Sequence, residues 1–439
     1  MTAPGSTNPT DSASQSLTPR KRALAEFKKR RINMIALRFL VFLVAVAVFA
    51  DFLASNKPLL CKLNGDIHVP VVEDYLVDFG LYRYEKELVN QNWRELQYDW
   101  AIWPLVRYRP TDIDYNNLRL NSPFGKQRVK SWQEWHYLGT DRDGRDVLSG
   151  LIHGTRISLS IGLVAAGIAG LIGIIIGSIA GYFGDTRFQL STIGIVMGGI
   201  GLVLGYFYGF QVRSTALSQG VESGALPLLL QLIFSFAILI GITVVFVWLG
   251  KPLERIPVLG RKRYVWLDIM ISRLIEIVST VPSLLLILTV MALTEKKSLF
   301  FLMLIIGLMS WPGVARYMRS EMLRTRNQAF VEAARAVGMS NFRILWRHAI
   351  PNSISPVLVV LTFGVAGAIA TEAALTFIGV GLPDTLVTWG GLLNLARRSQ
   401  SAWWLSLFPG IAIFLTITAI NLVGEGLRDA FNPRLQNGQ

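Results

Sequence analysis

The chain has 439 residues, of which 52% are hydrophobic and only 16% are charged, and its formal net charge is +14. Soluble domains carry about 25% charged residues, so this composition excludes an ordinary soluble protein. Several apolar runs also reach the ~20 residues that a helix needs to span a bilayer. The sequence therefore predicts a polytopic membrane protein made of helices. Nucleic-acid binding is the competing explanation of the basic balance, and it is set against the charge distribution below.

Eight apolar runs are long enough to cross a membrane. They cover residues 34–54, 157–181, 190–210, 226–249, 267–293, 298–315, 353–378 and 404–424. The first follows the basic segment RKRALAEFKKRR, as the apolar part of a secretory signal would. It is longer than most signals and lacks a small-residue cleavage pattern, so we expect an uncleaved anchor at 34–54.

Lysine and arginine concentrate in three connecting segments, 1–33, 250–263 and 316–351. With eight spans, all three fall on one side of the membrane, and the positive-inside rule places that side in the cytoplasm. The tails 1–33 and 425–439 are then both cytoplasmic. Orientation and attraction to anionic lipid account for the net charge better than nucleic-acid binding does.

Residues 55–155 form the one large polar segment, and this topology places it outside as an extracytoplasmic (periplasmic) domain. Its 13 basic and 14 acidic residues nearly balance. It is also rich in tryptophan and tyrosine. These aromatic residues either pack a small domain or contact a ligand delivered to it, and packing is the simpler interpretation.

Residues 330–352 read FVEAARAVGMSNFRILWRHAIPN, a polar helical pattern between two apolar runs. The alanines favour a helix, Gly338 permits a sharp turn, and Ser340 is a plausible N-cap for a second helix at 341–349. We expect Pro351 to end that helix. Its apolar positions fall on one helical face: Phe342, Leu345, Trp346 and Ala349.

Two interpretations of this short amphipathic helix remain open on physical grounds alone. It could lie in the lipid headgroups, as basic amphipathic helices do. Alternatively, its apolar face could fill a groove on a cytoplasmic partner.

The same stretch carries a family resemblance. The sequence Glu332-Ala333-Ala334, then Gly338, then Ile350-Pro351-Asn352 resembles the EAA loop of permease subunits of ATP-binding-cassette importers. Further segments resemble the subfamily that imports peptides and nickel: WPGVARYMRSEMLRTRNQAFVEAARAVG at 311–338, HYLGTDRDGRDVLSGLIHGTRISL at 136–159, EAALTFIGVGLP at 372–383 and FPGIAIFLTITAINLVGEGLRDAFNPR at 408–434. NKPLL after the first span and DFG at 78–80 look most like the Yej-type branch.

The resemblance implies the all-α transmembrane domain of a type I importer, in the inner (plasma) membrane of a bacterium. The chain would be a transport subunit and not an enzyme. It would form a translocation path for oligopeptides or related small solutes with a second homologous permease subunit. Two ATPase subunits would use ATP and Mg, and a substrate-binding protein would act outside the membrane. No cofactor would be bound by this chain.

In this family the short helix after the glycine is the coupling helix, which sits in a cleft of the ATPase. The predicted ATPase-docking and coupling residues are Glu332, Ala333, Ala334, Gly338, Ser340, Phe342, Leu345 and Pro351. The motif supplies the glutamate, the alanines and the glycine, and helical geometry supplies Phe342 and Leu345. We predict no catalytic, metal or cofactor-binding residues. No G-x-x-x-x-G-K-[ST] phosphate loop occurs, and the four histidines are scattered.

The family's six-span core corresponds to the anchor 34–54, the span 157–181 and residues 267–424, which include the cytoplasmic loop 316–351. Residues 185–265 are an insertion with two additional spans, an even number that preserves the orientation of everything downstream. Small residues recur every fourth position in two spans, a pattern suited to close helix contact: Gly173, Gly177 and Gly181, and Gly201, Gly205 and Gly209. We expect the inserted pair to pack on the outside of the core.

Two other functions compete with this prediction. An ATP-independent secondary transporter would use charged residues within spans as a proton relay, and Asp268, Arg273 and Glu276 are candidates, although a structural pair explains them as well. A membrane-anchored solute-binding protein would use the 55–155 segment alone. Neither explains the order of helix, glycine, amphipathic helix and proline on the inner face. The sequence does not name the cargo.

Overall fold

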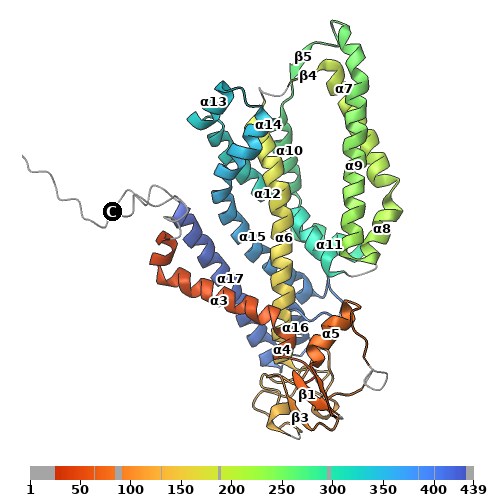
Figure 1. Cartoon of the computed structure of the whole chain (residues 1–439), viewed down its shortest axis with the longest axis vertical. Helices are drawn as coiled ribbons and strands as arrows, with labels where there is room; N and C mark the ends of the chain where they lie inside the picture. Colours follow the sequence, from red (N-terminus) through yellow and green to blue (C-terminus); the bar gives the residue numbers. More distant parts are fainter. Residues whose placement is uncertain are drawn as a thin grey trace, which may run out of the picture. The chain divides into compact units, whose positions relative to one another are not determined.

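The computed structural model describes residues 25–431 except 64, 85–90, 130, 186–188, 294–297, 384 and 400. Most of the described chain is helical, and its strands are only three or four residues long (Figure 1). The outer parts of the two predicted tails, 1–24 and 432–439, lie outside the described residues. The predicted all-α architecture is confirmed.

The chain divides into two compact units. One contains Met1–Leu163 and Val365–Gln439, and the other contains Val164–Gly364. Each unit boundary falls within a long helix, α6 (Val147–Phe183) or α15 (Ile350–Ile378).

The Val164–Gly364 unit holds the rest of α6, the first half of α15 and the elements between them. These are β4 (Gln189–Ser191), α7 (Thr192–Tyr206), η3 (Phe207–Gln211), α8 (Ser214–Ser223), α9 (Ala225–Gly250), η4 (Lys251–Arg255), β5 (Lys262–Tyr264), α10 (Leu267–Thr280), α11 (Ser283–Leu293), α12 (Leu299–Thr325), α13 (Ala329–Ala336), α14 (Asn341–Ile344) and η5 (Leu345–Ala349).

Seven helices in the described chain are long and apolar enough to cross a membrane, and a bent pair raises the number to eight. The bent pair is α10 and α11, whose axes differ by 71°. The break falls at Val281 and Pro282, where proline lacks the N–H group that would continue the helical hydrogen bonds. The predicted run 267–293 is therefore two helices. The run 34–54 is α3 (Arg31–Val48) followed by the short α4 (Ala50–Leu53), and the other six predicted runs each correspond to one continuous helical span.

The first glycine stripe is a close contact between α6 and α12, as predicted. A Cβ on Gly177 would lie 2.4 Å from the carbonyl oxygen of Ala315, and one on Gly181 would lie 2.5 Å from that of Arg319. Gly173 is equally tight against α12. These distances leave no room for any side chain, so the two helices touch along their backbones.

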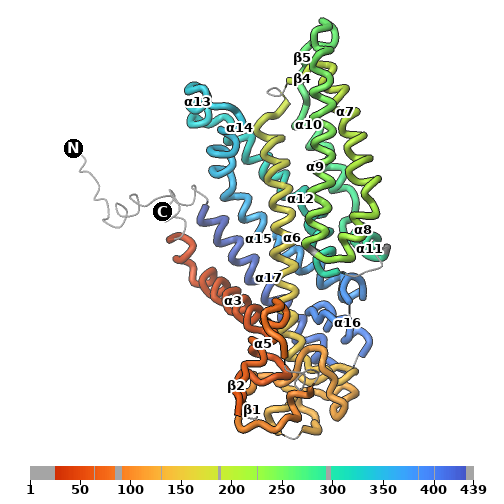
Figure 2. The backbone as a smooth tube through the Cα atoms, turned by 45° about the vertical axis from the view of Figure 1, so that its right-hand side comes forward, coloured from red at the N-terminus to blue at the C-terminus, as the bar shows by residue number. Residues whose placement is uncertain are grey.

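The second glycine stripe joins the two inserted spans to each other. Figure 2 shows α7 and α9 side by side. A Cβ on Gly205 would lie 2.8 Å from the Leu239 carbonyl oxygen, and one on Gly209 would lie 2.6 Å from that of Ser235. The second glycine stripe therefore forms the contact between the two inserted helices. The placement of the inserted pair outside the core stays a prediction.

The charged residues predicted on α10 divide between two contacts. Arg273 and Glu276 form an exposed ion pair of 2.6 Å, as expected from their spacing. Asp268 instead pairs with Arg319 of α12, with its Oδ2 2.7 Å from the Nη2 of the arginine. The carboxylate of Asp185 accepts hydrogen bonds from the first backbone N–H groups of α10. These contacts support the structural interpretation of the charges.

The other unit contains the remaining spans, α3 (Arg31–Val48), α17 (Trp403–Phe431) and the adjoining parts of α6 and α15. The shorter helices α4 (Ala50–Leu53) and α16 (Trp389–Arg397) also belong to it. Leu43, Leu159, Ile369 and Ile420, one from each span, meet in a buried cluster. Glu372 of α15 is fully buried and accepts a hydrogen bond from the hydroxyl of Ser158 at 3.2 Å.

The predicted extracytoplasmic domain belongs to this unit and is mostly loops. A small antiparallel sheet has the order β2-β1-β3, formed by β1 (Leu60–Leu63), β2 (Asp66–His68) and β3 (Trp100–Ile102). The helix α5 (Pro70–Asp78) and the short turns η1 (Tyr115–Asn117) and η2 (Trp132–Glu134) complete it.

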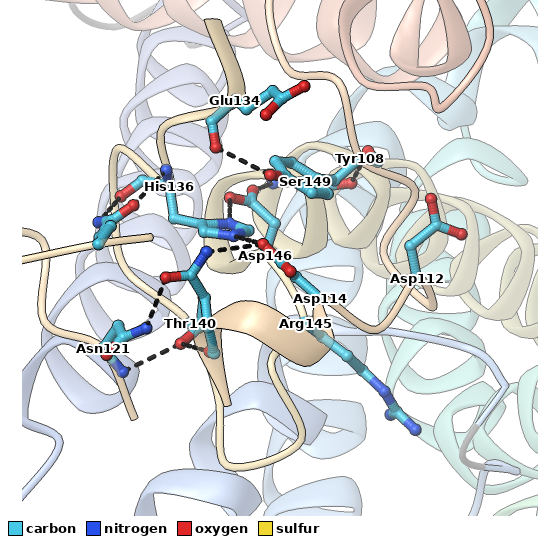
Figure 3. Close-up of polar contacts among 12 residues, drawn as sticks. Tyr108, Asp112, Asp114, Asn121, Glu134, His136, Thr140, Arg145, Asp146 and Ser149 are labelled. Carbon is cyan, nitrogen blue, oxygen red and sulfur yellow. Dashed lines mark hydrogen bonds and ion pairs between the residues drawn. The ribbon is translucent and has the colours of Figure 1, made fainter. Parts of the chain in front are cut away.

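Where this domain joins α6, His136 is completely buried between two carboxylates (Figure 3). Its Nδ1 lies 2.8 Å from Asp146, and its Nε2 lies 3.2 Å from Asp114. Burial alone would lower the pKa of His136, but these two carboxylates outweigh burial and raise it. For Asp114, burial is likewise outweighed, by hydrogen bonds from His136 and Asn117, and its pKa falls to about 2.

The same contact sets where α6 begins. Asp146 Oδ1 accepts a hydrogen bond of 2.6 Å from the backbone N–H of Ser149, which caps the first turn of the helix. The helix therefore starts at Val147 and not near residue 157. The last nine residues of the predicted outer segment 55–155 are helical.

Candidate functional site

The loop predicted to couple to a partner begins where α12 ends. Helix α12 continues to Thr325, ten residues past the predicted span 298–315. The hydroxyl of Thr325 lies 2.7 Å from that of Ser353 in α15. The guanidinium of Arg326 donates a 3.1 Å hydrogen bond to the carbonyl of Gly181 on α6. The base of the loop is thus tied to both neighbouring helices.

The first loop helix, α13, ends in a glycine turn. Gly338 has φ +83°, a left-handed conformation that favours glycine. Its N–H donates to the Arg335 carbonyl at 2.8 Å, and the Met339 N–H donates to the Ala334 carbonyl at 3.1 Å. This pair of bonds is the Schellman arrangement, which satisfies the last carbonyls of a helix. The predicted sharp turn is present.

The second loop helix begins at the predicted cap. The side chain of Ser340 accepts a 3.4 Å hydrogen bond from the backbone N–H of Arg343. The prediction that Pro351 ends this helix is wrong, because Asn341–Ile378 forms one continuous helical stretch. A π-helical turn, η5, immediately precedes the proline region. Wider π turns alter the hydrogen-bond register locally, and this one accommodates a residue that has no N–H group.

The amphipathic face is divided between this chain and the surface. Leu345 is only 1% exposed and packs with Met318 and Met322 of α12. It therefore cannot dock to a partner, which corrects its assignment to the docking surface. Phe342 and Trp346 are 62% and 50% exposed. The face turns its smaller aliphatic residues inward because the core formed by α6 and α12 lies beneath it.

The other predicted docking residues lie close to one another along the loop. Ala334 is half-buried against the core. The remaining predicted docking residues are exposed: Glu332, Ala333, Gly338, Ser340 and Pro351. Sequence reasoning missed Val337, which is 83% exposed at the end of α13. The available signal was an apolar residue directly before a turn glycine.

The exposed part of the loop offers shape and charge and no reactive group. Arg343 and Arg347 are exposed beside Phe342 and Trp346. Within the described residues, no group of three or more histidine, cysteine or acidic side chains could hold a metal ion. Such a surface can bind a protein groove and transmit movement.

Comparison with known proteins identifies the family. The profile described as "Binding-protein-dependent transport system inner membrane component" matches residues 256–437. The "N-terminal TM domain of oligopeptide transport permease C" matches residues 18–66. A putative peptide permease protein of Brucella suis is 30% identical over 340 residues, which cover 77% of this chain and 82% of the relative. The chain belongs to the family of binding-protein-dependent transport permeases.

Two Yej-type relatives are similar along almost their whole length. The peptidoglycan transport system permease protein YejE of Agrobacterium fabrum is 27% identical over 440 residues, covering 94% of this chain and 93% of the relative. The inner membrane ABC transporter permease protein YejE of Escherichia coli is 25% identical over 413 residues, covering 93% and 95%. The protein is an inner-membrane permease subunit of an ATP-binding-cassette importer, and a separate subunit hydrolyses ATP.

Proposed function

We propose that this permease forms, with a second homologous permease, the translocation path for oligopeptides or related small solutes. The cargo class is inferred from relatives named for peptide transport, including a dipeptide transport system permease protein of Alkalihalophilus pseudofirmus that is 29% identical over 303 residues. Two ATPase subunits using ATP and Mg and a substrate-binding protein outside the membrane complete the importer. Both termini lie in the cytoplasm.

The docking surface of this permease comprises Val337, Phe342 and Trp346, flanked by Glu332 and Ala333. The observation that supports this assignment is the difference in burial between Phe342 and Leu345. Phe342 points outward while Leu345, one turn later, is buried in the same chain. Because the core of this chain holds one side of the helix, the aromatic rings on the other side are held in a fixed position, as insertion into a groove of a partner requires.

The loop is built to transmit force. Its second helix is continuous with α15 as a stretch of 38 residues, which corresponds to about 57 Å at 1.5 Å per residue. A partner that displaces Phe342 would therefore act on a helix that continues into the predicted span 353–378. The ties from Thr325 to Ser353 and from Arg326 to Gly181 spread that displacement to α12 and α6.

Retention of the ATPase on affinity-tagged permease tests this assignment. Phe342→Ala should weaken retention by about tenfold or more, as truncation of an interface aromatic typically does. Phe124→Ala is the matched control, because Phe124 is also exposed, at 88%, but lies in the extracytoplasmic domain. Equal ATPase retention by both variants would remove Phe342 from the docking surface.

A further inference from the structure

The linker between α9 and α10, residues 251–266, is an ordered platform. Its strand β5 pairs antiparallel with β4, with Lys262 opposite Ser191. The Thr192 N–H donates to the Arg261 carbonyl at 3.1 Å, and the Ser191 hydroxyl donates to Glu254 at 2.6 Å. These contacts hold the linker across the base of the inserted spans.

The linker carries five cations and one acid. The cations are Lys251, Arg255, Arg261, Lys262 and Arg263, and every one of them is exposed. Among the residues that the structure describes, none of the five forms an ion pair, whereas Arg319 and Arg324 of α12 both do. The single acid, Glu254, accepts a hydrogen bond from Ser191. With five cations and one acid, the linker carries a net charge of +4, and within the described chain no ion pair offsets its five cations.

Large apolar side chains are interspersed with these cations. Val258 is 76% exposed, Trp266 is 62% exposed and Tyr264 is 52% exposed, and Ile256 is exposed as well. A linker that met only water would gain nothing from presenting such groups. Tryptophan and tyrosine are enriched where a membrane meets water, because each has an apolar body and a polar tip.

We propose that linker 251–266 is a binding surface for the headgroups of anionic phospholipids. Its cations would contact lipid phosphates, and Val258 and Trp266 would enter the boundary between headgroups and acyl chains. The apolar helix α9 leads into one end of the linker, and α10, the first half of the bent pair α10–α11, begins at the other end, so both ends adjoin candidate membrane segments. The role follows from charge complementarity, and it gives the insertion an anchor of its own.

This proposal extends beyond cargo transport and stands even if the coupling assignment fails. An acidic protein surface is the alternative occupant. The mixture of unpaired cations with exposed apolar residues favours lipid, since lipid offers phosphate and hydrocarbon side by side.

Lipid retention by the purified full-length permease tests the proposal. Native mass spectrometry would compare binding of dioleoyl phosphatidylglycerol with that of dioleoyl phosphatidylcholine. The triple variant Arg261→Gln, Lys262→Gln, Arg263→Gln should bind phosphatidylglycerol at least about tenfold more weakly, because each cation near an anionic membrane contributes severalfold. The matched control, Lys126→Gln, Arg128→Gln, Arg142→Gln, removes three exposed cations from the extracytoplasmic domain and should bind normally.

One further variant and one competition experiment separate lipid binding from other effects of the substitutions. Val258→Ser keeps every charge, so it avoids effects on membrane insertion, and it should also weaken phosphatidylglycerol binding. An excess of inorganic phosphate should displace little lipid, since free phosphate cannot use the apolar residues. Unchanged phosphatidylglycerol binding by both linker variants would overturn the proposal. So would full displacement by phosphate, or a triple variant that keeps its lipid and loses the ATPase.

Discussion

A Cβ on Gly177 would lie 2.4 Å from the carbonyl oxygen of Ala315, so α6 and α12 are in backbone contact. This contact lies about three helical turns before Thr325, where α12 gives way to the proposed coupling loop. The loop therefore starts from a helix that is packed rigidly along its length. Movement of the loop has to move α12 and α6 together.

Gly177→Val should destabilise the permease by about 3 kcal/mol, because overpacking forces the two backbones apart. The thermal midpoint of the detergent-purified protein measures the effect. Gly167→Val is a matched control on the same helix, since nothing lies within 4 Å of a Cβ at Gly167. Similar midpoints for the two variants would show that the close contact contributes nothing.

Gly338→Val should uncouple ATP hydrolysis from transport while leaving insertion intact. Nothing lies within 4 Å of a Cβ at Gly338, so the effect arises only from its φ of +83°. Asparagine tolerates this left-handed conformation much better than valine does. In the reconstituted importer, Gly338→Asn should retain most transport. Normal transport by Gly338→Val would contradict the role of the turn.

Leu345→Ala and Phe342→Ala should have opposite consequences. Leu345 is buried, so its truncation should cost about 2–5 kcal/mol of unfolding free energy. Phe342 is largely exposed, so its truncation should leave stability within about 0.5 kcal/mol. Thermal unfolding and ATPase retention, measured on both variants, separate a core residue from a docking residue. Loss of stability in Phe342→Ala alone would reverse the assignment.

The junction of the predicted extracytoplasmic domain with α6 should be most stable in mildly acidic conditions. The pKa of His136 is raised, so its contribution is complete below the unfolded value of 6.5 and is lost as pH rises through the folded pKa. The pKa of Asp114 is lowered to about 2, so its contribution is present above 3.8 and is lost as pH falls toward 2. Greatest stability is expected between pH 3.8 and 6.5.

Amide hydrogen exchange across residues 136–146, corrected for intrinsic rates, measures this dependence in the intact chain. Protection should decrease as pH rises above the window. His136→Gln should lose most of that pH dependence, whereas His68→Gln in the same domain should keep it. An unchanged profile in His136→Gln would show that other groups control this junction.

The spans were predictable from sequence because the bilayer demands a fixed length of apolar residues, and the runs satisfy it. The turn at Gly338 and the cap at Ser340 were also predictable, since both depend on residues that are neighbours in the chain. Hydropathy missed the start of α6 at Val147, because the capping carboxylate of Asp146 lies within a polar motif.

The errors in the site arise from contacts that are distant in sequence. A helical period places Phe342 and Leu345 on one apolar face, but it does not show that Leu345 joins the buried cluster of Met318 and Met322 while Phe342 stays exposed. The helix was expected to end at Pro351, because the π turn that carries it onward depends on how the loop packs. Tertiary packing therefore determines both the burial of Leu345 and the continuation of the helix past Pro351.

The central claim is that the loop around Gly338 transmits ATP hydrolysis by a separate subunit to the transport path. The most direct test is peptide uptake by proteoliposomes that contain both permeases, with the ATPase, binding protein and ATP added or withheld. The account predicts uptake only when ATP is hydrolysed by the ATPase subunits. Uptake by this permease with no ATP and no second protein would contradict it.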